Sequence, residues 1–197
     1  MPVKDNREYR EMIPVAPKVE GRRIDCERYV EGYATTYTKP YTMGVIDGIE
    51  YKERFDRNAF VGVNLRDVIC QRDHNGTVFA RTANGTLVLD PNDPHGLFVA
   101  MNLDKSAEAR NAYEEISNGL ITKMSIGFIV DKDSYDRETH TRTILKVKKL
   151  FDVSIVTYPA NNDTNICARS WIDGVIDAES REAVERRKQV IRIICNT

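Results

Sequence analysis

The sequence lacks a paired cysteine motif and an excess of charge of either sign. Its four cysteines are scattered and form no CxxC pair, which argues against a zinc site and suits a reducing compartment. The 29 basic and 30 acidic residues nearly cancel, to a formal net charge of −1. No basic stripe with interleaved aromatic residues is present, so nucleic acid is not expected as a partner.

Long apolar runs are also lacking. None approaches the roughly 20 residues that a membrane-spanning helix needs, so no membrane association is expected. Residues 1–20 are polar and contain no apolar signal core, which leads us to expect a cytoplasmic protein. The 197 residues are enough for one domain with a sizeable core.

Three segments differ in composition. Residues 1–25 are charged and contain three prolines, so we interpret them as a flexible leader that becomes ordered only against the body or a partner. Residues 26–168 carry short β-type runs and form the predicted body. Residues 169–197 are predicted to be a C-terminal amphipathic helical segment. Its apolar side is formed by Ala183, Val184, Val190, Ile191 and Ile194.

The body predicts a mainly β fold with flanking helices. The β-type runs are residues 29–38, 66–72, 77–81, 86–89, 96–103, 122–130, 142–147 and 150–157. Asn-Gly pairs at 75–76 and 84–85 predict hairpins, and the charged stretch 133–141 predicts an exposed loop. One helix interrupts the strands, with Asp104 as its expected N-cap and Gly119 as its stop. We expect a closed or nearly closed antiparallel β-barrel of about seven or eight strands.

Ser125 lies in the middle of the apolar run 123–128. Because side chains alternate along a strand, Met124 and Ile126 are expected to face the core, and Ser125 and Gly127 the other side. The glycine leaves space beside the hydroxyl. Ser125 is therefore either a candidate nucleophile or an ordinary serine on the solvent face of a strand.

His74 and Asp152 could complete a catalytic set with Ser125. His74 stands at the end of a β-type run, and imidazole titrates in the range that a general base needs. Asp152 is a poor strand residue, so it either orients an imidazole or blocks aggregation as an edge-strand charge. His74 alone is also compatible with a structural role. Together, a serine, a histidine and an acid can cleave a peptide bond without metal or cofactor.

Two alternative centres are weaker. Cys70 lies four residues before His74 on the same run, about 13 Å away by strand rise, which is too far for a thiolate–imidazole pair. A buried structural thiol is the better interpretation of Cys70. A metal site from Asp73, His74 and His95 is not specified, because a long loop separates the two histidines. No metal or cofactor is expected, and His95 and His140 are interpreted as surface residues.

An ordered series of motifs resembles the prohead (capsid maturation) protease family of tailed phages of the HK97 type, over about residues 31–168. The series comprises Gly32-Tyr33-Ala34, residues 53–60, Asp73-His74, residues 93–101, Asn118-Gly119, Met124-Ser125-Ile126-Gly127-Phe128 and the run LFDVSIVTYPAN at 150–161. The chain departs from the family pattern at Asn58, where the family usually has glycine. It departs again at Asp152, where the family more often has glutamate.

The resemblance implies a serine endopeptidase with a barrel fold similar to that of the herpesvirus assembly proteases. Ser125 would be the nucleophile, His74 the general base and Asp152 the third member. The implied substrates are the scaffold or delta segment of the major capsid protein and the protease itself. Cleavage would take place inside the assembling prohead, in the cytoplasm of the bacterial host. Related barrels pair through a helix, so the resemblance is compatible with a homodimer.

Two other classes of function stay open at this point. A β-barrel with a helical tail could serve as a non-enzymatic capsid scaffold or assembly module, in which Ser125 is incidental. A cysteine-dependent or metal-dependent hydrolase is the second alternative. Inhibition by fluorophosphonates, by thiol blockers or by chelators would separate these classes.

Overall fold

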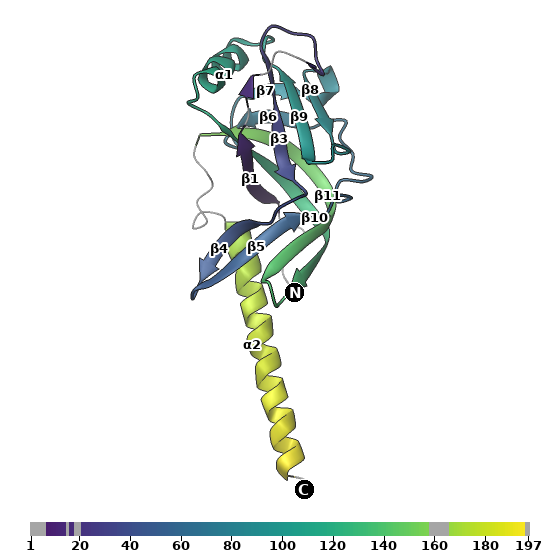
Figure 1. Cartoon of the computed structure of the whole chain (residues 1–197), viewed down its shortest axis with the longest axis vertical. Helices are drawn as coiled ribbons and strands as arrows, with labels where there is room; N and C mark the ends of the chain where they lie inside the picture. Colours follow the sequence, from purple (N-terminus) through teal and green to yellow (C-terminus); the bar gives the residue numbers. More distant parts are fainter. Residues whose placement is uncertain (1–6, 15, 18–20, 158–165, 196–197) are drawn as a thin grey trace.

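The computed structural model describes residues 7–14, 16–17, 21–157 and 166–195. These residues form a mainly β body, with helix α1 (Ala107–Ser117) at one end and helix α2 (Ile166–Cys195) projecting from the other (Figure 1). The strands of the described residues belong to two sheets. The mainly β fold with helices is thus confirmed.

The larger sheet is built around two long strands. Its seven strands are β1 (Glu8–Pro14), β10 (Lys123–Asp136), β11 (Thr141–Val156), β5 (Ile49–Phe55), β4 (Tyr41–Ile46), β6 (Ile69–Arg72) and β7 (Val78–Arg81). The order β1-β10-β11-β5-β4 forms the main path, and β6 with β7 joins along β11. Strand β11 is long enough to pair with β5 near its start and with β6 near its end, in parallel in both cases.

The smaller sheet covers the core. It has the order β2 (Ala16–Pro17), β3 (Tyr29–Thr36), β9 (Gly96–Asn102) and β8 (Leu87–Asp90). Every residue of β9 is buried. The main hydrophobic cluster draws Leu97 and Met101 from β9, Phe55 from β5 and Phe128 from β10, and helix α1 adds Ala109, Ala112 and Ile116. Burial of these apolar side chains is the main contribution that holds the body together.

The expected closed antiparallel barrel is not confirmed. Among the described residues, no strand pairing closes either sheet on itself, and β11 makes two parallel pairings. The structure also has more strands than the sequence analysis expected. Strands β4 and β5 were missed, although Asp47 and Gly48 form the two-residue turn between them with positive φ of 52° and 79°. An Asp-Gly pair between β-type runs is the signal that would have found this hairpin.

Three local predictions were wrong. The stretch 133–141 is mostly exposed, but it is not a loop throughout, because β10 extends to Asp136 and β11 begins at Thr141. The two runs 142–147 and 150–157 belong to the single strand β11. The pair at 84–85 makes no hairpin, since β7 and β8 lie in different sheets. Gly85 instead caps the 3₁₀-helix η1 (Thr82–Asn84) with φ of 73°.

Helix α1 begins two residues later than expected. Its N-cap is Ser106, whose hydroxyl accepts a hydrogen bond from the Ala109 N–H at 3.0 Å. The Asp104 carboxylate instead accepts from the Glu27 N–H at 2.9 Å. At the other end, Gly119 has φ of 71° and stands just beyond the helix, as predicted.

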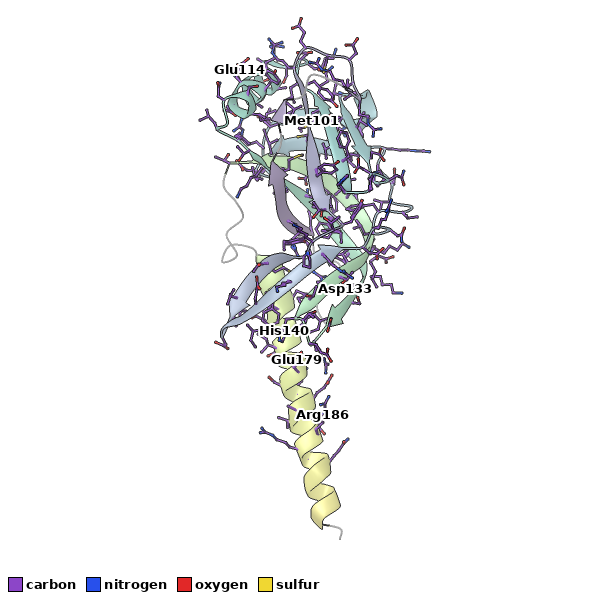
Figure 2. All side chains as sticks on the ribbon, in the orientation of Figure 1. Met101, Glu114, Asp133, His140, Glu179 and Arg186 are labelled. Atoms are coloured by element: carbon purple, nitrogen blue, oxygen red, sulfur yellow. The ribbon has the colours of Figure 1, made fainter. Side chains whose placement is uncertain are left out.

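Helix α2 packs apolar side chains on the body near its start, and farther along Arg137 pairs with Glu179 and Glu182. Trp171, Ile172 and Val175 are buried in a second hydrophobic cluster with Met43 and Tyr51. Figure 2 shows Glu179 near the His140 turn of the β10–β11 hairpin, with Arg186 farther along the projecting helix. In this projecting part Ala183 and Val184 are exposed, Val184 to 49 %, so they do not pack on the body. The side chains of Val190, Ile191 and Ile194 lie outside the described residues. No described helix is long and apolar enough to cross a membrane.

Strand β1 lies within the segment that the sequence analysis assigns to a leader. It pairs with β10 over residues 8–14, and the side chains of Glu8 and Arg10 are buried. They belong to a buried ion cluster, which we define as Glu8, Arg10, Glu53 and Arg142. Arg10 Nε lies 2.5 Å from Glu53 Oε1, and Arg142 Nη1 lies 2.7 Å from Glu8 and 3.0 Å from Glu53. The division of the chain into leader, body and helical segment stays a prediction.

Candidate active site

Strand β11 brings the site residues together because it lies between β10 and β6. In the antiparallel β10–β11 pair, Ser125 is opposite Ser154 and Gly127 is opposite Asp152. Residues directly opposite each other in a sheet share a face, so all four side-chain positions lie on one face. On the other edge of β11, Asp152 to Ile155 pair with β6 in parallel. The end of β6 therefore lies next to the sheet face that carries Ser125 and Asp152.

His74 reaches this face from a tight turn after β6. The Asn75 N–H donates to the Arg72 carbonyl at 3.0 Å, and the central residues Asp73 and His74 have positive φ of 47° and 58°. Two consecutive positive φ values are those of a type I′ turn. The sequence analysis centred the turn on the Asn-Gly pair that follows. In the structure the histidine itself occupies a left-handed position, which non-glycine residues adopt at a cost of about 1–2 kcal/mol.

Asp73 fastens this turn to the end of β11. Its carboxylate accepts two hydrogen bonds from Thr157, one from the backbone N–H at 2.8 Å and one from the hydroxyl at 2.9 Å. Its own N–H donates to the Ile155 carbonyl at 3.0 Å. These bonds offset the strained backbone and fix where the imidazole of the next residue stands.

The three predicted site residues form one hydrogen-bonded chain. His74 Nδ1 lies 2.6 Å from Asp152 Oδ1, and His74 Nε2 lies 2.6 Å from Ser125 Oγ. Asp152 is 0 % exposed and Ser125 is 2 % exposed, whereas the His74 side chain is 16 % exposed. With Nδ1 protonated towards the carboxylate, Nε2 is the acceptor for the serine proton. This is the arrangement in which an imidazole can remove a proton from a hydroxyl.

Asp152 has two further partners that the sequence analysis did not name. The Ser154 hydroxyl donates to Oδ1 at 2.6 Å, and the Arg7 guanidinium forms an ion pair with Oδ2. Burial raises the pKa of Asp152, but the bonds from His74 and Ser154 and the charge of Arg7 outweigh burial and hold this pKa below its usual value. The carboxylate is therefore ionised at neutral pH. Ser154 could have been found from its position two residues after Asp152 on the same face.

Gly127 provides the space that these groups fill. A Cβ atom at position 127 would collide with Asp152 Oδ2 and would stand 2.9 Å from both Nε and Nη2 of Arg7. The sequence analysis expected Gly127 to leave room beside the Ser125 hydroxyl. In the structure that room is taken by the far end of the carboxylate and by the guanidinium.

The alternative centres are not assembled. The Cys70 side chain is fully buried, and burial raises the pKa of its thiol to about 12, so it is almost entirely protonated at neutral pH. His95 lies near Asp93 and Tyr33, and His140 near Tyr135, both away from His74. Within the described part of the chain, no three His, Cys, Asp or Glu side chains gather as a metal site would require.

Comparison with known proteins identifies the family of the chain. The family model described as caudovirus prohead serine protease matches residues 18–174 of this chain. The chain belongs to this family. Among curated proteins, the prohead protease of Enterobacteria phage HK97 is 31 % identical over 84 residues, which is 42 % of this chain and 37 % of that protein. The match thus spans little more than a third of the relative. No solved structure matches the chain.

The part that matches the prohead serine protease family contains the whole hydrogen-bonded chain. His74, Ser125, Asp152 and Ser154 all fall within residues 18–174. Strand β1, with Arg7 just before it, lies outside the match, as does most of helix α2.

Proposed function

We propose that this protein is a serine endopeptidase of phage prohead maturation, with Ser125 as nucleophile, His74 as general base and Asp152 as the acid that orients the imidazole. The observation that carries the proposal is the continuous chain of 2.6 Å contacts from Asp152 through His74 to Ser125. Membership of the caudovirus prohead serine protease family supports it independently.

The geometry accounts for acyl transfer without a cofactor. As Ser125 Oγ attacks a peptide carbonyl, His74 Nε2 takes the serine proton and the imidazole becomes a cation. The ionised Asp152, which holds Nδ1, stabilises that cation. Nε2 then returns the proton to the leaving amine, and water repeats the sequence on the acyl-enzyme to release the second product.

The proposed substrates are the scaffold or delta segment of the major capsid protein and the protease chain itself. The proposed place of cleavage is the assembling prohead in the bacterial host cytoplasm. Only 2 % of Ser125 is exposed. This low exposure is compatible with activity that depends on encounter with the capsid protein.

The test uses intact mass. Purified wild-type protein and Ser125→Ala are each incubated with a fluorophosphonate probe, alone and with the cognate capsid protein. We expect one probe adduct or self-cleavage in the wild type, none in Ser125→Ala, and shortened capsid protein only with active enzyme. Unmodified masses and uncut capsid protein in every sample would contradict the proposal and favour a scaffold role.

A further inference from the structure

Arg7 approaches the candidate active site from outside the part of the chain that matches the family. Its guanidinium forms an ion pair with Asp152 Oδ2, the carboxylate oxygen that His74 and Ser154 do not use. Its guanidinium carbon also lies 4.4 Å from the centre of the Phe151 ring. Two separate contacts thus place one guanidinium at the outer end of the Asp152–His74 pair.

The surrounding residues form a slot for this guanidinium. Gly127 contributes no side chain, and a Cβ atom there would stand 2.9 Å from Arg7 Nε and Nη2. Phe151 forms one side of the slot, and the fully buried Asp152 carboxylate closes its end. The backbone that follows Arg7 is held by the pairing of β1 with β10, which begins opposite Phe128. The slot is therefore built from β10 and β11, and the pairing of β1 with β10 holds Arg7 beside it.

From this geometry we infer that Arg7 is a positioning residue of the active site, which holds Asp152 and sets the strength of its interaction with His74. The inference rests on the proposed function. A cation at Oδ2 fixes the carboxylate so that Oδ1 faces the imidazole. It also offsets part of the negative charge of the carboxylate that His74 contacts, so loss of Arg7 changes the charge that the imidazole faces.

The other charged and titratable groups around the Asp152–His74 pair are neutral or are bound to other partners. On β6, Cys70 is buried and its raised thiol pKa keeps it neutral. In the turn, Asp73 is bound to Thr157, and Arg72 is paired with Glu115 of α1. On β11, Lys149 is a second cation at the Phe151 ring, with Nζ 4.4 Å from the ring centre. Among the described residues, Arg7 is the arginine or lysine that forms an ion pair with the Asp152 carboxylate.

The test compares Arg7→Gln with Arg7→Lys and Lys149→Gln. Lys149→Gln is the matched control, because it removes the same charge from the same aromatic ring without touching Asp152. The first readout is the NMR titration of the three histidine rings, with the His74 signal assigned by His74→Asn. The second readout is the pH dependence of fluorophosphonate labelling at Ser125. Thermal unfolding shows whether each variant is folded.

In Arg7→Gln we expect the His74 titration midpoint, and the acid limb of the pH profile of labelling, to move to higher pH by about one unit. This is the size expected for the loss of a unit charge roughly 6 Å away in a partly screened site. Labelling should fall by up to about tenfold at pH values below the wild-type midpoint, which is the largest loss that a one-unit shift produces. Arg7→Lys should recover most of the shift, and Lys149→Gln should show little of it. Wild-type midpoints in Arg7→Gln, or an equal shift in Lys149→Gln, would overturn the inference.

The same experiment separates this inference from the proposed function. Labelling of wild-type Ser125 that is lost in Ser125→Ala supports the proposed function whatever Arg7→Gln does. Absence of labelling from the wild type, with the capsid protein present, would contradict the proposed function and with it the positioning role of Arg7. A labelled wild type with an unchanged Arg7→Gln profile contradicts the role of Arg7 alone.

Discussion

Gly127 on β10 lies directly opposite Asp152 on β11, and the carboxylate occupies the space where a side chain at position 127 would stand. The absence of a Cβ atom therefore allows a buried acid to lie across the neighbouring strand. This relationship gives the glycine of the Ser-Ile-Gly-Phe run a physical role. It keeps open the position from which Asp152 reaches His74.

Gly127→Ala should impair the site more than the fold. The added methyl group must displace the Asp152 carboxylate and the Arg7 guanidinium, and overpacking of this kind costs about 1–3 kcal/mol. Misplacement of the acid should lower fluorophosphonate labelling of Ser125 at least about tenfold. The matched control is Gly44→Ala on β4, where a Cβ atom would make an ordinary 3.4 Å contact with Ile172. Equal labelling in wild type and Gly127→Ala would refute the proposed role of the glycine.

Ser154→Ala should weaken the hold on the acid while leaving the chain folded. It removes the donor that lies 2.6 Å from Asp152 Oδ1, the oxygen that also contacts His74. A hydrogen bond to a charged group contributes about 1.5–3 kcal/mol, so labelling of Ser125 should fall about ten- to hundredfold. Ser134→Ala, an exposed serine on β10, should label like the wild type. An undiminished labelling rate in Ser154→Ala would show that His74 and Arg7 orient the acid without Ser154.

Ser125, His74 and Asp152 could be predicted because each is marked by the residues next to it in the sequence. Ser125 and Asp152 each interrupt an apolar run, and His74 ends one, so strand alternation and the motif series point to them directly. The structure brings these three side chains together. Their catalytic roles remain the proposal tested above.

The rest depends on pairings that local pattern does not encode. Arg7 is one charged residue among many in the first 25 positions, and only the pairing of β1 with β10 brings it to Asp152. The parallel neighbours of β11 were missed for the same reason, because hydropathy alternation indicates a strand but not its partner. Helix α2 is long and continuous, yet its buried apolar side chains are a few residues near Trp171. The apolar positions farther along the helix do not indicate where this packing lies.

Loss of one charge from the buried ion cluster should destabilise the larger sheet. Glu53 is fully buried and accepts hydrogen bonds from Arg10, Arg142 and Tyr41. Burial raises the pKa of Glu53, but the two arginines outweigh burial and keep it below its usual value, so the carboxylate is charged. Glu53→Gln leaves buried arginine charge without its main partner, which should lower the free energy of unfolding by about 3–5 kcal/mol.

Urea denaturation measures this loss, with Glu50→Gln as the control. Glu50 lies on the same strand, is exposed, and pairs with Lys52 at the surface. Substitutions at such surface positions usually change stability by less than about 0.5 kcal/mol. A small loss in Glu53→Gln, similar to that in Glu50→Gln, would mean that Glu8, together with Asp133 at Arg142, suffices to hold the two arginines.

The lowered pKa of Asp152 predicts a specific dependence of stability on acid pH. A carboxyl group whose pKa is lower in the folded than in the unfolded state stabilises the fold above the unfolded value, about 3.9, and loses that contribution as pH falls through the folded value. The difference in free energy of unfolding between wild type and Asp152→Asn should therefore be nearly constant from about pH 5 down to about pH 4. Histidine is already protonated in this range, so its titration does not contribute to the change. The difference should shrink steadily below about pH 4. Urea titrations at a series of pH values measure both proteins, and a difference that stays flat down to pH 3 would show that Asp152 gains no net stabilisation from its partners.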